Sequence, residues 1–250
     1  LNLKDNDVAR WLPRGAVEMG LVWANYLGRD VPALNAVMVQ GSVGSPEELI
    51  MALPEIQEIY SEVLAEWDIV PTGFMALPLL KASIFCREQP VRTLEELRTR
   101  KLRVWSNDQV ETFTKLGVSA QIVGQNELYI ALQTGVVDAQ ENTWSNIYTK
   151  KFFEVQDGVT ETNHGIIDYL VVTSTEFVDS LDAADRDQLM GIIKDVSTER
   201  NAMAEGINQD NRAKILAEGG AIRELSDDDR AAWVGAMAPV WDQFADGIGQ

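Results

Sequence analysis

The chain is poor in the residues from which many catalytic and metal sites are built. Its 250 residues include one cysteine, Cys86, and one histidine, His164. A single cysteine excludes an internal disulfide and any multi-cysteine metal site, and a single histidine excludes a histidine-rich one. Only one candidate remains for the base of a Ser-His-Asp arrangement. These counts remove most of the metal-site and catalytic alternatives, and our expectation is no metal, no cofactor and no catalytic residue.

Basic residues and long hydrophobic runs are also scarce. The chain has 21 Lys and Arg against 39 Asp and Glu, which gives a net charge of −18. Binding of nucleic acid or an anionic membrane surface needs clustered basic residues, so both are excluded as partners, whereas one buried arginine can still hold one anionic ligand. No run of 18 apolar residues exists, so no direct membrane insertion is expected.

The first third of the chain carries mixed helix and strand signals. A surface helix is predicted over 3–14, ending at Gly15. Ser45-Pro46-Glu47-Glu48 has the form of a helix start with a capping box. Pro54 lies inside the helix that follows and should kink or interrupt it. Strands are predicted over 18–24, 36–39, 69–75 and 82–87.

Strands and helices alternate regularly in the middle of the chain. After a short capped helix at 93–97, the alternation predicts a parallel sheet with ligand sites at the carboxyl ends of its strands. Gln125 and Asn142 stand at two helix entrances, where backbone N–H groups favour an anionic or polar guest. The predicted elements are a strand at 101–105, a helix at 107–116, a strand at 118–123, and a helix, strand and helix within 122–156.

The C-terminal part is mostly helical. A strand is predicted over 165–173, and a continuous helix runs from Asp182 to about Glu218. At 1.5 Å per residue that helix is roughly 50 Å long, so it should bridge two lobes or break. Its expected buried face holds Leu189, Ile193, Val196, Met203 and Ile207, with Arg200 as a paired core arginine. A last helix, capped by Ser226, aligns Trp233, Met237, Trp241, Phe244 and Ile248 on one face.

Four segments within residues 102–156 carry a family resemblance. They are Leu102-Arg-Val, the run ELYIALQTGVVDAQEN from Glu127 to Asn142, Asn146-Ile-Tyr, and KFFEVQ from Lys151 to Gln156. Together they resemble the solute receptors of tripartite ATP-independent periplasmic (TRAP) transporters of the DctP type. That family's run is close to E-V-Y-x-A-L-Q-x-G-V-V-D-G-Q-E-N-P. This chain departs from it at Ala139 and Thr143.

The resemblance implies an α/β, two-lobed periplasmic-binding-protein-like fold with a long helix bridging the lobes. Lobe I would comprise 1–81 plus 169–208, and lobe II 82–168 plus 209–250. The family has a further strand and helix before the segment that corresponds to Leu1, and we expect these to be missing from the sequence given.

The resemblance also implies a function and a site. The expected protein is a monomeric periplasmic receptor that binds a small organic acid between its lobes and delivers it to the membrane subunits of a TRAP permease. The family arginine that forks onto the ligand carboxylate falls on Arg103, and the neighbouring asparagine falls on Asn142. Further family pocket positions fall on Trp23, Ser106, Gln125 and Tyr169, and the indoles of Trp105 and Trp144 are weaker candidates for its walls.

Other interpretations of the same residues stay open at this point. Without the resemblance, an arginine at a strand end is mostly structural, Asn142 is an N-cap, and the tryptophans are core residues. Glu127 and Asp168 could serve a hydrolase or lyase as paired carboxylates, although their spacing does not favour it. A stand-alone sensory receptor would use the same site. An arginine predicts an acid without distinguishing a sugar acid, 2-oxo acid, dicarboxylate, aromatic acid or sulfonate.

Overall fold

The computed structural model describes residues 8–24, 27–28, 31, 33–35, 46–75, 82–165 and 169–248. The chain divides into two compact units, and each is built around its own sheet. Unit 1 comprises residues 1–38, 45–77 and 167–204, and unit 2 comprises 39–44, 78–166 and 205–250. Both units are therefore assembled from segments that are far apart in the sequence.

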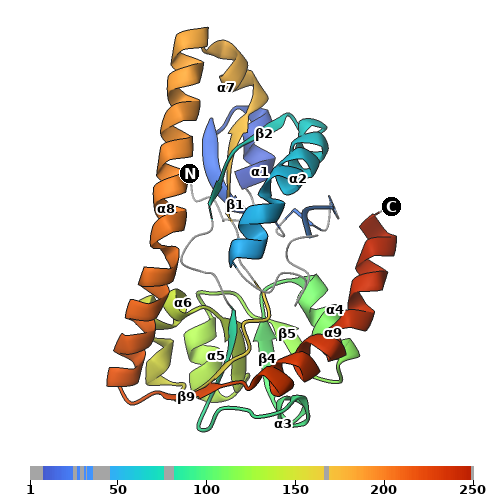
Figure 1. Ribbon diagram of the computed structural model, residues 1–250, viewed down its shortest axis with the longest axis vertical. Coiled ribbons are helices and arrows are strands. Elements are labelled where there is room, and N and C mark those ends of the chain that lie inside the picture. Colours follow the sequence, from blue (N-terminus) through green and yellow to red (C-terminus); the bar gives the residue numbers. More distant parts are fainter. Residues whose placement is uncertain are drawn as a thin grey trace. The chain divides into compact units, whose positions relative to one another are not determined.

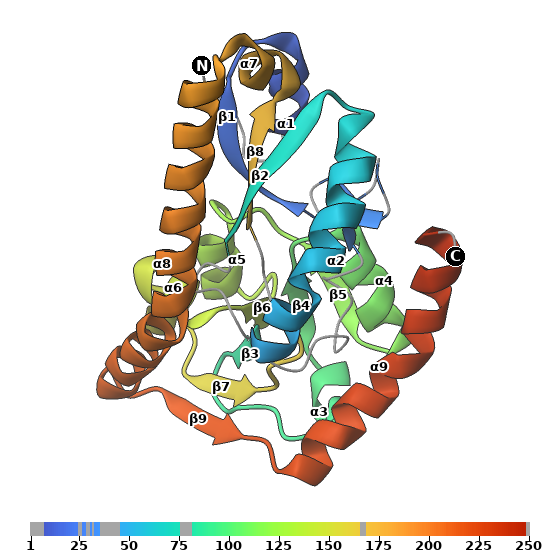
Figure 2. The same ribbon diagram turned by 45° about the horizontal axis from the view of Figure 1, so that its top comes forward.

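Unit 1 contains a three-stranded antiparallel sheet in the order β1-β8-β2 (Figures 1 and 2). β1 pairs with β8 over its whole length, which places Trp23 opposite Tyr169. The pairing of β2 shifts between Pro71 and Gly73, as expected where proline has no N–H to donate. The elements are α1 Val8–Trp11, η2 Leu12–Arg14, β1 Met19–Trp23, α2 Pro46–Ala65, β2 Ile69–Met75, β8 Tyr169–Ser174 and α7 Thr175–Ser180.

Several sequence predictions for unit 1 can be compared with these elements. The helix predicted over 3–14 is, from Val8 on, the short helix α1 followed by the 3-10 helix η2. The 3-10 helix ends at Gly15 as predicted, in the left-handed conformation that glycine adopts readily (φ 64°). Pro54 does not interrupt α2, which runs unbroken from Pro46. Leu49 and Leu64 are buried near its two ends, so packing on both sides of the proline offsets its cost. The strand predicted over 36–39 and the cap at Ser45 lie outside the described residues.

Unit 2 contains a six-stranded sheet in the order β5-β4-β6-β3-β7-β9. β4 is parallel to both of its neighbours, which confirms the parallel arrangement predicted for the middle of the chain. β3 is antiparallel to β6 and β7. The elements are β3 Ser83–Cys86, α3 Leu94–Arg98, β4 Lys101–Val104, α4 Asn107–Lys115, β5 Ser119–Ile122, α5 Leu128–Thr134, β6 Ala139–Asn142, α6 Trp144–Thr149, η5 Phe152–Glu154, β7 Gly158–Glu161, β9 Ala221–Glu224 and α9 Asp227–Ile248.

Helices cover both faces of the unit 2 sheet. Successive residues of a strand point to opposite faces, so Ile84 and Phe85 of β3 belong to different cores. The core on the first face includes Ile84, Leu102, Val104, Phe113, Trp233 and Met237. The core on the second face includes Phe85, Leu128, Leu132, Trp144, Ile147 and Phe152.

The long helix α8, Ala183–Ala217, is continuous as predicted (Figure 1). Asp182 caps it, because its Oδ1 accepts a hydrogen bond of 2.9 Å from the backbone N–H of Asp185. Residues 183–204 belong to unit 1 and residues 205–217 to unit 2. One helix therefore contributes to both units.

The buried face of α8 differs from the predicted one. Val196 and Met203 are 45% and 44% exposed, and Arg200 is half-buried. The helix packs closely on Gly73, where an added Cβ would lie 2.6 Å from a methyl group of Ile193. Such close packing uses small and polar side chains, which a search for hydrophobic periodicity omits. The buried positions are Ile193, Ser197, Ala204, Asn208, Asn211 and Ile215.

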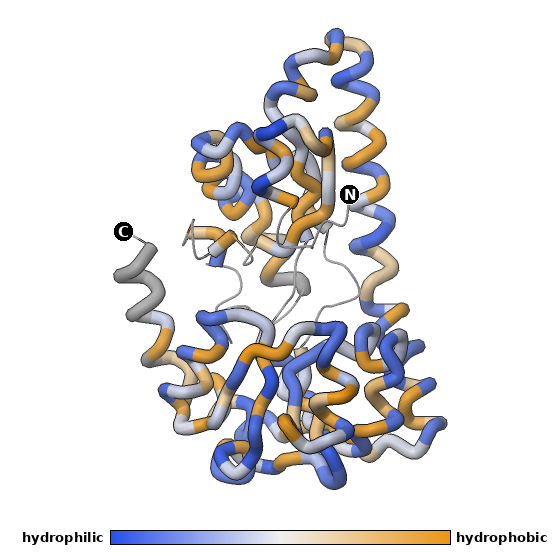
Figure 3. Tube along the Cα trace, turned by 180° about the vertical axis from the view of Figure 1, so that it is seen from behind, coloured by the Kyte–Doolittle hydropathy of each residue, from blue (hydrophilic) through white to orange (hydrophobic). Residues whose placement is uncertain are grey.

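Polar residues interrupt the apolar ones along the helices (Figure 3). Among the residues that the structure describes, no helix is both long enough and apolar enough to span a membrane.

Candidate ligand-binding site

Arg103 is held in a fixed orientation near the end of β4. The residue is 3% exposed. Its Nε donates to the backbone oxygen of Val123 at 3.0 Å, and its Nη2 donates to Gln125 Oε1 at 3.2 Å. Its Nη1 donates to the backbone oxygen of Glu141 at 3.4 Å. These three acceptors are neutral, and together they orient the guanidinium plane.

The indole of Trp105 contributes to the same arrangement. The guanidinium carbon of Arg103 lies 5.8 Å from the centroid of that ring, within the range of a cation–π interaction. The backbone N–H of Trp105 donates to Gln109 Oε1 at 3.0 Å. The structure thus brings Arg103 together with Gln125 and Trp105. Gln125 lies in the turn before α5 and does not cap that helix.

Asn142 is the last residue of β6 and is 1% exposed. It does not cap α6, because Thr143 Oγ1 accepts the capping bond from the N–H of Asn146. Instead Asn142 Oδ1 accepts from the N–H of Thr143 and from Asn146 Nδ2, both at 2.9 Å. The N-cap interpretation of Asn142 is therefore wrong, and its amide is fixed by other bonds.

Ser106 precedes α4 and is 7% exposed, but its hydroxyl makes no capping bond to that helix. Asp108 lies in the first turn. Burial raises the pKa of this carboxyl group, while hydrogen bonds from Ser106 and from the backbone act in the opposite direction. The entrance of α4 therefore combines a buried hydroxyl with a carboxyl group that ionises less readily than in water.

The two candidates in unit 1 contact each other. Trp23 and Tyr169 are directly opposite on β1 and β8, and their ring centroids lie 5.1 Å apart at an interplanar angle of 65°. This edge-to-face geometry is favourable for aromatic pairs. The structure thus joins these two residues into one aromatic pair.

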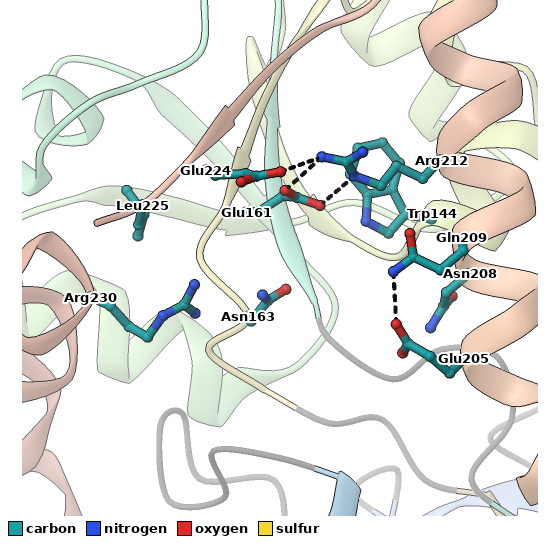
Figure 4. A pocket seen from close by; sticks show the side chains of 10 residues that line it. All are labelled: Trp144, Glu161, Asn163, Glu205, Asn208, Gln209, Arg212, Glu224, Leu225 and Arg230. Atoms are coloured by element: carbon teal, nitrogen blue, oxygen red, sulfur yellow. Dashed lines mark hydrogen bonds and ion pairs between the residues drawn. The ribbon is translucent and has the colours of Figure 1, made fainter. Parts of the chain in front are cut away.

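Trp144 lies partly in the core of unit 2 and partly at a pocket. It is 4% exposed and packs edge-to-face on Phe85 at 5.2 Å. It also lines a cavity of about 320 Å³, with Arg212 over its ring at 6.0 Å (Figure 4). Arg212 donates to both oxygens of Glu161 and to Glu224 at 2.8 Å. Salt bridges therefore occupy the wall of this cavity next to Trp144.

Three buried polar residues near Asn142 were not predicted as functional. Gln140, Glu141 and Gln156 are at most 3% exposed. Glu141 Oε1 lies 3.0 Å from His164 Nε2, and both side chains are inaccessible, which agrees with a structural role for His164. The signal in the sequence is Gln140-Glu141-Asn142 itself, because three consecutive polar residues in a buried strand need specific partners.

The alternative based on paired carboxylates can be examined only in part. Glu127 is exposed at the start of α5, and Asp168 lies outside the described residues. In the parts of the chain that are described, no group of three or more His, Cys, Asp or Glu side chains could hold a metal ion.

A model of the family "Bacterial extracellular solute-binding protein, family 7" (DctP) matches residues 82–247. The chain belongs to this family. The DctP-type relatives include the C4-dicarboxylate-binding periplasmic protein DctP of Vibrio cholerae, 46% identical over 162 residues, which cover 64% of this chain and 49% of that protein. The protein of the same description from Rhodobacter capsulatus is 31% identical over 97% of this chain and 68% of its own length. The chain spans about half the length of the first of these relatives.

Solved TRAP periplasmic solute-binding proteins have the same fold. The one from Shewanella oneidensis, with bound succinate, has a TM-score of 0.90, is 27% identical, and covers 99% of this chain and 81% of its own. The one from Chromohalobacter salexigens, with bound D-glucuronate, has a TM-score of 0.90 and 26% identity over 97% of this chain and 80% of its own. These likenesses confirm the resemblance to DctP-type receptors and the two-lobed α/β fold class.

Proposed function

We propose that this DctP-family chain acts as a periplasmic receptor that binds a small organic acid and delivers it to the membrane subunits of a TRAP permease, without chemical conversion. The observation that carries the proposal is Arg103, buried and oriented by three neutral acceptors within the segment that matches the family model. The ligands and names of the relatives support it, because C4-dicarboxylates, succinate and D-glucuronate share a carboxylate group.

The geometry of Arg103 suits this role. A guanidinium presents parallel N–H donors that match the two oxygens of a carboxylate. Because the bonds to Val123, Glu141 and Gln125 already restrict the side chain, less entropy is lost when the ligand binds. We propose Asn142 as a second donor to the ligand. Further proposed contacts are Trp23, Ser106, Gln125, Tyr169, Trp105 and Trp144.

Calorimetry with succinate, L-malate and D-glucuronate tests the proposal. We expect the wild-type protein to bind at least one of them with a Kd of about 1 µM or lower, roughly −8 kcal/mol. Arg103→Ala should weaken that binding by about 100-fold or more, since a charge-assisted bidentate pair is lost. Arg92→Ala is the matched control, because Arg92 is an exposed arginine of the same unit. The affinity of this variant for the acid should stay within twofold of the wild-type value.

Two outcomes would contradict the proposal. One is unchanged affinity in Arg103→Ala for an acid that the wild-type protein binds. The other is conversion of the bound acid, detected by mass spectrometry, because turnover would make the chain an enzyme.

A further inference from the structure

Three buried side-chain amides form a hydrogen-bonded series in unit 2. Gln156 Nε2 donates to the backbone oxygen of Phe85 at 2.9 Å. Gln140 Nε2 donates to Gln156 Oε1, and Asn142 Nδ2 donates to Gln140 Oε1 at 2.7 Å. The three residues are 3%, 0% and 1% exposed, respectively. We call Gln156, Gln140 and Asn142 the amide relay.

Backbone groups anchor both ends of the amide relay. The carbonyl oxygen of Phe85 can only accept a hydrogen bond, so Gln156 must turn its NH₂ group toward it. At the other end the N–H of Thr143 can only donate, so Asn142 must turn its oxygen toward it. Both anchors require the same order of donors and acceptors. Reversing one amide would break its bonds and leave buried polar atoms unsatisfied, at about 1–3 kcal/mol for each group.

This order determines what Asn142 can offer to a ligand. Its Oδ1 already accepts two hydrogen bonds, from the N–H of Thr143 and from Asn146 Nδ2. One hydrogen on Nδ2 is used by Gln140. An asparagine amide has two acceptor positions and two donor hydrogens, so these bonds leave one N–H donor and no acceptor.

We infer that Gln140 and Gln156 are positioning residues that hold Asn142 as a hydrogen-bond donor toward the ligand. This inference rests on the proposed function, in which Asn142 contacts the bound acid. A carboxylate oxygen, which only accepts, fits a position that only donates. A ligand group that only donates, such as an ammonium, is disfavoured there.

The sheet places the amide relay beside Arg103. Gln140 on β6 is paired with Arg103 on β4, and Ser83 on β3 is paired with Asn142. Paired residues share a face, and residues two apart on one strand share it too. Arg103, Gln140 and Asn142 therefore lie on the same face of the sheet. Backbone pairing therefore places the charged donor and the neutral donor on one face, with Asn142 two residues along β6 from the partner of Arg103.

A purely structural network would also stabilise the fold, so stability alone does not test the inference. A double-mutant cycle distinguishes the two roles. If Gln140 acts on binding through Asn142, its removal has no further effect once the Asn142 amide is absent. If Gln140 only supports the fold, the affinity losses of the two single variants multiply in the double variant.

The cycle uses Gln140→Met, which keeps the chain length and removes the amide, together with Asn142→Ala and the double variant. Calorimetry with succinate, L-malate and D-glucuronate should show about tenfold weaker binding for each single variant, the loss of roughly one charge-assisted hydrogen bond. The double variant should bind within about twofold of Asn142→Ala. The control is Gln89→Met, at an exposed glutamine of unit 2 outside its strands, which should stay within twofold of wild type. The inference is overturned if the two affinity losses multiply to about 100-fold in the double variant, or if Gln140→Met binds as tightly as the wild type.

A measurement without ligand keeps the two proposals apart. Side-chain ¹⁵N–¹H NMR of the wild-type protein should show one Nδ2 proton of Asn142 exchanging at least tenfold more slowly with water than in Gln140→Met. Equal exchange in both proteins would overturn the amide relay even if the acids bind. If no acid of the panel binds to the wild-type protein, the proposed function fails, and the role of Asn142 toward the ligand fails with it.

Discussion

The contact between Glu141 and His164 gives the most demanding prediction about stability. The two side chains are 0% and 1% exposed, and Glu141 Oε1 lies 3.0 Å from His164 Nε2. His164→Leu keeps a side chain of similar bulk but leaves the carboxylate buried without this partner. Leaving a buried polar group without its partner costs about 1–3 kcal/mol, and more where that group is charged. The edge-to-face contact of His164 with Phe113, at 5.9 Å, is lost as well.

Urea unfolding and calorimetry measure this cost. For a chain of this size, each kcal/mol lowers the unfolding temperature by about 2–4 °C, so the transition that includes unit 2 should fall by roughly 2–12 °C. Glu141→Gln/His164→Leu should recover part of the loss, because the carboxyl group that lost its partner is then absent. Glu111→Gln, at an exposed carboxylate, serves as the control. A loss below about 1 kcal/mol in His164→Leu, or a double variant less stable than His164→Leu, would contradict a stabilising contact between Glu141 and His164.

Two further predictions concern titrating groups. Burial raises the pKa of the Cys86 thiol to about 11. At pH 8 its reaction with a thiol reagent should therefore be at least about 100-fold slower in the native protein than in urea. Equal rates in the two conditions would contradict the burial of this thiol. Burial also raises the pKa of the Asp108 carboxyl group above its ordinary value of 3.8, so the folded state binds the carboxyl proton more tightly than the unfolded state does. The free energy of unfolding therefore falls as the pH rises from 3.8 through the raised pKa. Asp108→Asn should therefore gain stability over wild type between pH 3 and pH 7 in urea unfolding, and a constant difference across that range would contradict the assignment.

The elements with strong local signals could be predicted from the sequence. Thr93, Asp182 and Ser226 accept capping bonds where their spacing predicts helix starts. The parallel arrangement of β4 followed from the strand–helix alternation. β7 and β9 were not predicted; they pair with each other from distant parts of the chain, a contact that the local sequence does not contain.

The buried face of α8 shows why hydrophobic pattern alone was insufficient. Ser197 and Ala204 are buried while Val196 and Met203 are exposed, and the face that lies close to Gly73 presents Ile193 and Ser197. Polar Asn211 is buried as well, where its Nδ2 donates to Ser145 Oγ at 3.0 Å. Such positions depend on contacts between distant segments, which the local sequence does not contain.

The family resemblance named the candidate site residues, whose contacts with a ligand stay a prediction, but it could not give the bonds between them. The family resemblance pointed to Arg103, Gln125 and Asn142, and the structure joins the first two directly. The contribution of Gln156 could not be inferred, because its bond to Gln140 forms across 16 positions of the chain. Asn142 was expected to cap a helix, whereas Thr143 does so.

A crystal structure of the protein with succinate, L-malate or D-glucuronate tests the role of Arg103 in ligand binding. We expect both oxygens of one carboxylate to lie about 2.7–2.9 Å from guanidinium nitrogens of Arg103. We also expect Asn142 Nδ2 to face a ligand oxygen. A ligand whose carboxylate is bound elsewhere, with no contact to Arg103, would contradict it.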